Sequence, residues 1–198
     1  VDFLIQMSGT RQHCEIDFFG GEPLLNWDVV KQTVEYIEQE APKHNKIFKL
    51  TLTTNGMLLS QEKIDYVNEH KMSLVLSLDG REDVHNAMRP VAGSGANSYE
   101  YIAKNLVNAV KQRHGLEYYV RGTYTHKNLD FTKDVLAMSD LGFEHLSMEP
   151  VVGEEGDYVL REEDWPPLEK EYEKLADIYL QRQKDGWGEK FNFFHFRM

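Results

Sequence analysis

The stretch EIDFFGGEPLLN, from Glu15 to Asn26, runs from a strand-like segment into two glycines and a Glu-Pro pair. Paired glycines permit positive φ angles and let a ligand approach the main chain closely. Pro23 fixes its own φ and biases Glu22 toward an extended conformation. The stretch therefore predicts a stiff strand end that presents backbone polar groups and one carboxylate.

Composition predicts a single globular domain. The chain has 198 residues, of which 41% are hydrophobic and 28% charged, which is enough apolar material for one sizeable core. The 22 Lys and Arg residues against 33 Asp and Glu residues give a net charge of −11. This charge argues against nucleic acid and favours a small molecule or a cationic peptide as partner. We expect no membrane segment, no signal peptide and a cytoplasmic location.

Apolar runs with strand character alternate with longer segments of helical period. The expected strands are Cys14–Phe19, Ile47–Thr54, Leu74–Asp79, Glu117–Thr125 and His145–Val151. Between them, Ser98 and Asp130 are the expected N-caps of two helices, and Gly142 is expected to end the second of these. Repeated strand, loop and helix units imply parallel strands with right-handed crossovers. The predicted fold is α/β, a complete or partial barrel.

The carboxyl ends of the expected strands are polar or rich in glycine. They read Gly20-Gly21-Glu22-Pro23, Thr53-Thr54-Asn55-Gly56, Ser77-Leu78-Asp79-Gly80, Arg121-Gly122-Thr123 and Glu149-Pro150-Val151. In α/β barrels the chemistry lies at these ends of the strands. The sequence therefore predicts a functional site at one edge of the sheet.

The residue types at this edge suit a zwitterion attached to a nucleoside. Glu22 can accept hydrogen bonds from an ammonium group, and Arg121 or Arg89 can hold a carboxylate. Ser77, Asp79 and Asn55 can bind hydroxyl groups. Two simpler interpretations stay open. TTNG and SLDG are also ordinary turn signals, and Arg121 could form a structural ion pair with Glu149 or Asp79.

Four motifs together resemble the radical S-adenosylmethionine (SAM) enzymes: FFGGEPLLN, LTTNGMLL, LSLDGREDVHNAMRP and YYVRGTYT. More narrowly, the chain resembles peptide maturases that carry a C-terminal SPASM domain. The segments DLGFEHLSMEPVV and FNFFHF are similar to the maturases of six-cysteine (SCIFF) peptides. The resemblance covers essentially the whole chain, and it implies a partial (β/α)6 barrel of the radical SAM type.

The resemblance assigns cofactor-binding roles to individual positions. Gly20, Gly21, Glu22 and Pro23 match the motif that binds the amino group of S-adenosylmethionine, and Arg121 is the preferred partner of its carboxylate. The strand ends that contain Thr54, Asn55, Ser77 and Asp79 match those around the ribose and the methionyl group. Glu149, Pro150 and Val151 match the segment that passes the adenine.

The chain departs from the family in its cysteines. The CxxxCxxC loop that supplies three thiolates to a [4Fe–4S] cluster is absent, and the one cysteine, Cys14, is expected to be a small buried residue. We therefore expect a core domain truncated at both ends, with the first strand of the barrel missing and no metal bound. Residues 1–12 would be the tail of a preceding helix or linker, and residues 190–198 the start of a connection to a missing SPASM domain.

For the intact enzyme, the resemblance implies reductive cleavage of S-adenosylmethionine and the formation of thioether crosslinks in a cysteine-rich precursor peptide. The chain by itself is expected to be inactive. Two alternatives remain: a noncatalytic peptide-binding scaffold and a barrel enzyme that needs no cluster. A missing first strand would leave the edge near Cys14 unpaired, so self-association across that edge is a further expectation.

Overall fold

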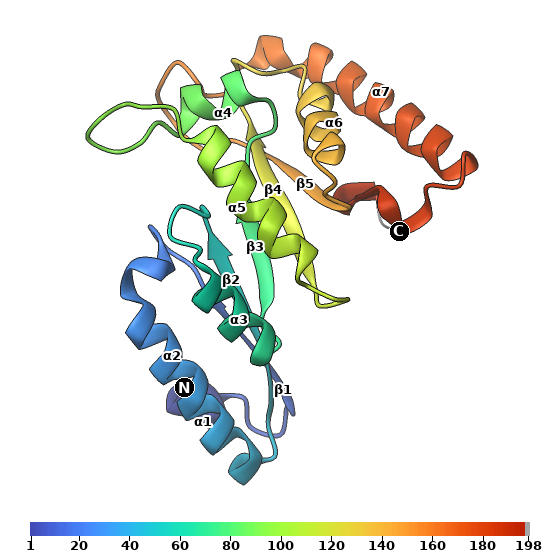
Figure 1. The fold of residues 1–198 in the computed structure, drawn as a ribbon. Helices are drawn as coiled ribbons and strands as arrows, with labels where there is room; N and C mark the ends of the chain where they lie inside the picture. The colour runs from blue at the N-terminus through green and yellow to red at the C-terminus, as the bar shows by residue number, and fades with distance from the viewer. Residues whose placement is uncertain (197–198) are drawn as a thin grey trace.

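The computed structural model describes residues 1–196, and its centre is a parallel sheet of six strands (Figure 1). The strands lie side by side in chain order, which is the arrangement that successive right-handed crossovers produce. They are β1 (His13–Phe18), β2 (Ile47–Thr54), β3 (Ser73–Ser77), β4 (Tyr118–Tyr124), β5 (His145–Pro150) and β6 (Asn192–Phe193). The α/β fold with sequential parallel strands is confirmed.

Helices connect the strands and cover one face of the sheet (Figure 1). The α-helices are α1 (Asp2–Met7), α2 (Trp27–Glu40), α3 (Gln61–Glu69), α4 (Glu82–Met88), α5 (Tyr99–Lys111), α6 (Thr132–Asp140) and α7 (Trp165–Lys184). Short 3-10 turns complete the chain: η1 (Pro23–Asn26), η2 (Ala41–His44), η3 (Glu162–Asp164), η4 (Gly188–Lys190) and η5 (Phe194–Phe196). No helix within residues 1–196 is long and apolar enough to cross a membrane.

The core lies between the sheet and these helices, because alternate strand residues point to opposite faces. Leu52, Leu76 and Val120 are fully buried on the helix side. The intervening strand residues form a second, polar face, which we call the polar face of the sheet. It carries Glu15, Asp17, Lys49, Thr53, Ser77, Arg121, Thr123, Ser147 and Glu149.

The expected strands agree with the structure to within two residues at each end, and Ile47–Thr54 agrees at both ends. The sixth strand was not expected. It has only two residues, so no alternation is visible in the sequence, and it joins the sheet because Phe193 is buried and Asn192 N–H bonds the carbonyl of Glu144 at 2.8 Å. Helix α1 occupies part of the segment 1–12.

Asp130 does not cap a helix. Helix α6 begins one residue later than expected, with Phe131 as its N-cap, because the Asp130 carboxylate instead binds Arg81 at 2.6 Å. Ser98 is the N-cap residue of α5, but its hydroxyl donates to the carbonyl of Arg89 at 2.6 Å. Gly142 follows α6 with a φ of 90°, as its C-terminal role requires.

Candidate functional site at the carboxyl edge of the sheet

The predicted site residues do meet at the carboxyl edge of the sheet. Ser77 is the register partner of Arg121 on the next strand, and Arg121 is the partner of Ser147 beyond it. Thr123 and Glu149 are register partners two residues further along β4 and β5. Since paired residues of parallel strands point to the same face, these five side chains share the polar face of the sheet.

The Gly20-Gly21 backbone is open to a ligand. Both glycines are exposed, and a Cβ atom added to either would meet no protein atom within 4 Å. Gly20 has a φ of +133°, a conformation that other residues rarely adopt, so glycine is required there by the backbone itself. Gly21 has no such constraint, and its lack of a side chain leaves room in front of the main chain.

The Glu22 carboxylate ties the end of β1 to the end of β2. It accepts hydrogen bonds from Leu24 N–H at 3.0 Å, the Thr54 hydroxyl at 2.8 Å and Asn55 N–H at 2.8 Å. The first of these caps η1, which begins at Pro23. A carboxylate offers about four lone-pair sites, so the three internal bonds leave about one for a ligand.

The TTNG segment forms a turn and also faces the site. The Thr54 hydroxyl accepts from Gly56 N–H at 3.1 Å, and the Asn55 side-chain carbonyl accepts from Met57 N–H at 2.9 Å. Within residues 1–196 the Asn55 amide group makes no hydrogen bond as a donor, so it is available at the edge. The turn interpretation and the site interpretation of this segment are therefore compatible.

Asp79 points into the protein and not toward the open edge. Its side chain is 1% exposed, and it receives a bidentate pair of hydrogen bonds from Arg89 at 2.6 and 3.1 Å. It also accepts from Thr123 N–H at 3.1 Å. This carboxylate therefore holds the ends of β3 and β4 together, and Arg89 neutralises it.

Arg121 is exposed and forms no ion pair within the described part of the chain. The structural ion pair that the sequence left open is absent, because Asp79 pairs with Arg89 and Glu149 pairs with His195. A guanidinium between two hydroxyl-bearing strand neighbours is an available binding group for a carboxylate. Arg121 is thus the uncommitted cation at this edge among residues 1–196.

Glu149 belongs to a small polar cluster on the polar face. Its carboxylate accepts from the Ser147 hydroxyl at 3.1 Å and lies 3.3 Å from His195 Nε2, which is also 3.3 Å from Ser147. Pro150 is exposed, and Val151 N–H bonds the carbonyl of Tyr124 at 2.9 Å. The sequence did not predict a role for His195. The motif FNFFHF does not indicate that His195 contacts Glu149, which lies 46 residues earlier.

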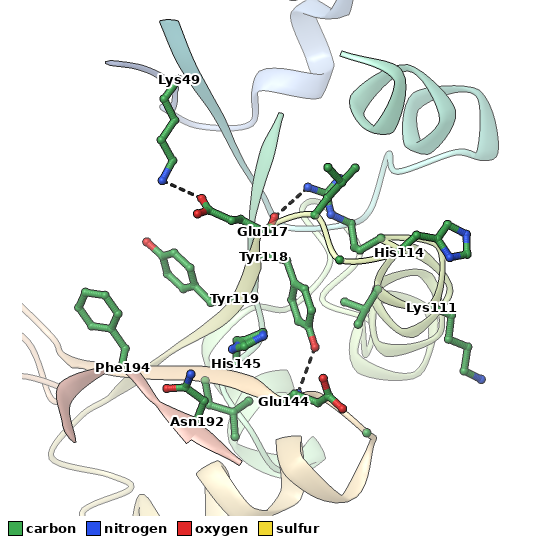
Figure 2. A pocket seen from close by; sticks show the side chains of 16 residues that line it. Lys49, Lys111, His114, Glu117, Tyr118, Tyr119, Glu144, His145, Asn192 and Phe194 are labelled. Carbon is green, nitrogen blue, oxygen red and sulfur yellow. Dashed lines mark hydrogen bonds and ion pairs between the residues drawn. The ribbon is translucent and has the colours of Figure 1, made fainter. Parts of the chain in front are cut away.

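A cavity of about 600 Å³ lies at the opposite, amino edge of the sheet (Figure 2). Tyr119 and Phe194 stack on one side of it with ring centroids 5.9 Å apart, and Lys49 pairs with Glu117 at 2.7 Å. None of the predicted cofactor-binding residues lines this cavity. It is therefore distinct from the candidate site.

Comparison with known proteins decides the family. The model of the Radical SAM superfamily matches residues 8–142, which include the strand ends from Gly20 to Thr123. The chain belongs to the radical SAM superfamily. The resemblance carried by its four sequence motifs is confirmed at this level.

Among the curated relatives, a cysteine-type anaerobic sulfatase-maturating enzyme from Clostridium perfringens (strain 13) is 33% identical over 78 residues. That match covers 39% of this chain and 21% of the relative. The radical SAM cyclopropyl synthase TigE from Paramaledivibacter caminithermalis is 25% identical over 100 residues, covering 50% of this chain and 20% of the relative. The chain thus spans only a minor part of either relative.

Among solved structures, native anSMEcpe with bound AdoMet and Kp18Cys peptide superimposes with a TM-score of 0.79 at 21% identity. The match covers 98% of this chain and 54% of that one. The same protein with bound AdoMet and Cp18Cys peptide gives a TM-score of 0.80 at 20% identity, covering 99% and 56%. At this identity the likeness shows the fold, which the radical SAM superfamily shares.

The sequence resemblance implies two bound groups, S-adenosylmethionine and a [4Fe–4S] cluster. The residues of this chain fit S-adenosylmethionine but not the cluster. The sequence contains one cysteine, Cys14, which is buried on the face shared by Ile16 and Phe18, so three thiolates for a [4Fe–4S] cluster cannot come from this chain. S-adenosylmethionine fits the donor set: Arg121 can bind its carboxylate, and the open Gly20-Gly21 backbone leaves space beside it.

Proposed function

We propose that this chain is the core of a radical SAM enzyme that binds S-adenosylmethionine at the carboxyl edge of the sheet and modifies a peptide. The observation that carries the proposal is the unpaired Arg121, placed between Ser77 and Ser147. The neighbouring carboxylates, Asp79 and Glu149, already have partners of their own. Arg121 is therefore free to bind the carboxylate of a ligand. The proposed reaction forms sulfur-to-carbon thioether crosslinks in a cysteine-rich precursor peptide.

Each predicted residue has a definite part in this proposal. The backbone carbonyls at Gly20 and Gly21, with the remaining acceptor site of Glu22, bind the ammonium group of the methionyl moiety. Arg121 binds its carboxylate, and Ser77 and Asn55 bind hydroxyl groups. Three further residues, Pro23, Thr54 and Asp79, shape the site through backbone or internal contacts, and the segment 149–151 passes the adenine.

When bound, the cofactor would accept one electron from a [4Fe–4S] cluster of the intact protein and release methionine and a 5′-deoxyadenosyl radical, which would abstract a hydrogen atom from the peptide. The contribution of this chain is to hold the cofactor in one orientation. Arg121 on β4 and the Glu22 region after β1 would hold its two charged groups, and the segment 149–151 at the end of β5 would face its nucleoside. No cluster-dependent step is assigned to this chain.

A peptide partner is supported by two findings. The name of the Clostridium perfringens relative describes an enzyme that matures sulfatases, and anSMEcpe has been solved with peptides bound. The net charge of −11 favours a cationic peptide over nucleic acid or an acidic protein. A cytoplasmic location belongs to the same proposal, since a single cysteine gives no disulfide framework.

Replacement of Arg121 tests this function. Arg121→Ala removes a charge-assisted hydrogen bond of about 1.5–3 kcal/mol, so the affinity for S-adenosylmethionine is expected to fall roughly tenfold to a hundredfold. Calorimetric titration measures the affinity, and thermal unfolding checks that the fold persists. Arg11→Ala is the matched control, because Arg11 is exposed on the loop before β1, at the amino edge of the sheet. Equal affinities for the two variants would refute the assigned role of Arg121.

A further inference from the structure

Two loops at the carboxyl edge of the sheet are joined by a hydrogen-bonded pair between the partly buried His126 and the buried Asp164. His126 follows β4, and Asp164 ends η3, beyond the loop that follows β5. Nδ1 of His126 lies 2.9 Å from each carboxylate oxygen of Asp164. Asp164 is 2% exposed, and its other partner is the N–H of Arg161 at 2.8 Å. His126 is therefore the one side chain within residues 1–196 that pairs with this buried carboxylate.

Burial acts to raise the pKa of Asp164, but the Arg161 N–H and His126 outweigh it and hold that pKa below its ordinary value. The carboxylate is therefore ionised at neutral pH. A hydrogen bond to an ionised acceptor is stronger than one between neutral groups, and its geometry is more restrictive. The pair fixes where residue 164 lies relative to the end of β4.

The loop 151–161 is attached to the end of β4 at further points. Val151 N–H bonds the carbonyl of Tyr124 at 2.9 Å, and His126 N–H bonds the carbonyl of Tyr158 at 3.0 Å. The Tyr158 ring packs over the loop's own glycines, because a Cβ on Gly156 would lie 2.8 Å from that ring. The loop is thus a compact unit, and His126 holds it through both backbone and side chain.

This loop begins at the segment that passes the adenine in the proposed function. Its second residue, Val152, has a side chain that is 93% exposed, although it lies directly beside the strand ends. Ligand sites are lined mainly by apolar side chains with a few polar groups, so an exposed valine at this edge suits one face of a purine. The position of the loop therefore bears on the adenosyl half of the ligand and not on the methionyl half.

We propose that His126 is a positioning residue that, through Asp164, holds the loop 151–161 against the adenosyl half of the site. The inference rests on the proposed binding of S-adenosylmethionine at this edge. The methionyl half is bound by Arg121, in the middle of β4, and by the Glu22 region after β1. Within residues 1–196 neither side chain forms a hydrogen bond or ion pair with the loop 151–161. Loss of the His126–Asp164 pair should therefore weaken binding of the adenosyl half of the ligand and leave binding of the methionyl half unchanged.

His126→Ala tests the inference when three ligands are titrated: S-adenosylhomocysteine, 5′-deoxyadenosine and methionine. The two adenosine-containing ligands should bind about tenfold or more weakly, whereas the affinity for methionine should be unchanged. Hydrogen exchange of the amides in residues 151–161 should accelerate in the same variant. Asp164→Asn, which preserves the side-chain volume, is the second variant and should give the same selective loss if His126→Ala does not fold.

Lys127→Ala is the matched control. Lys127 is adjacent to His126 and contacts Asp157 on the same loop, but both side chains are largely exposed and such a pair contributes little. All three affinities should be unchanged in this control. Unchanged adenosine affinity and unchanged loop exchange in both His126→Ala and Asp164→Asn would overturn the inference. Failure of the unmodified protein to bind any adenosine ligand would instead refute the proposed function, and this inference with it.

Discussion

At the scale of single residues, Glu22 combines a structural role with a proposed binding role. Its three internal hydrogen bonds reach Leu24, Thr54 and Asn55, so one side chain determines how the first two strand ends face each other. This arrangement orients the carboxylate before any ligand arrives. Preorganised polar groups bind a ligand at lower entropic cost than mobile ones.

Glu22→Gln should destabilise the protein. The amide keeps one acceptor oxygen but turns the other position into a donor, which then faces the N–H of Asn55 or the other donors. A donor or acceptor left unsatisfied in this half-buried setting costs roughly 1–3 kcal/mol. Urea unfolding measures the change, with Glu15→Gln as control, since Glu15 is exposed on β1. Equal stability of the two variants would show that the Glu22 bonds contribute nothing to folding.

The positions of the site residues were predictable from sequence where they follow directly on a strand. Gly20 and Asn55 come after β1 and β2, Ser77 ends β3, and parallel strands bring such ends together. Arg121 was expected at a strand end, but it lies in the middle of β4 and joins the site because it is the register partner of Ser77. Their partners were not predictable in the same way. Asp79 lies ten residues from Arg89, and both could equally have faced a ligand. Only the structure, in which Arg89 at the end of α4 pairs with Asp79 after β3 at 2.6 Å, shows that they neutralise each other.

At the scale of elements, charged side chains join neighbouring helices beside the strand ends. Arg81, at the start of α4, bonds the fully buried Asp134 on α6 at 2.7 Å. The neighbouring Gly80 passes so close to α6 that a Cβ there would lie 2.2 Å from Asp134 Cβ. This close contact explains why the turn after β3 needs glycine, and it holds Asp79 at the fixed position that supports β4.

Stability should fall as the pH is lowered from 7.5 to 5.5, partly because of His85 on α4. Burial lowers the pKa of this fully buried imidazole from its ordinary 6.5. The unfolded chain therefore takes up a proton near pH 6.5 that the folded chain does not. The titration of His85 has no effect on stability well above this pH, and it favours unfolding increasingly below it. The effect is at most about 1.4 kcal/mol per pH unit.

Urea unfolding at several pH values measures this dependence. The comparison is His85→Gln, which removes the titrating group, with His13→Gln as control, because His13 is exposed at the start of β1. The decline toward pH 5.5 should be shallower in His85→Gln and unchanged in His13→Gln. An identical pH dependence in all three proteins would contradict the assignment to His85.

The elements differ in how well their boundaries could be predicted from the sequence. The long strand Ile47–Thr54 was predicted in full, since Phe48, Leu50 and Leu52 alternate with polar residues along most of its length. The two-residue β6 has no period to detect, and its pairing depends on tertiary contact with β5. The start of α6 was misplaced because Asp130, a favoured N-cap residue, has a stronger partner in Arg81.

At the scale of the whole molecule, the sheet has an open polar face and an unpaired edge at β1 (Figure 1). Exposed edge strands pair readily with other chains, so we expect self-association that increases with protein concentration. Light scattering over a wide concentration range measures it. A monodisperse monomer at every concentration would contradict this expectation.

The most direct test of the central claim is to locate the binding site of S-adenosylmethionine by NMR chemical-shift mapping. The strand ends around Gly20 and Ser77 are separated from the part of the amino-edge cavity that lies before β4 and β5, around His114 and Gly142. We expect shifts at Gly20, Gly21, Ser77 and Arg121, and none at His114 or Gly142, which line the amino-edge cavity. Shifts confined to the amino-edge cavity, or no shifts at saturating ligand, would contradict the account.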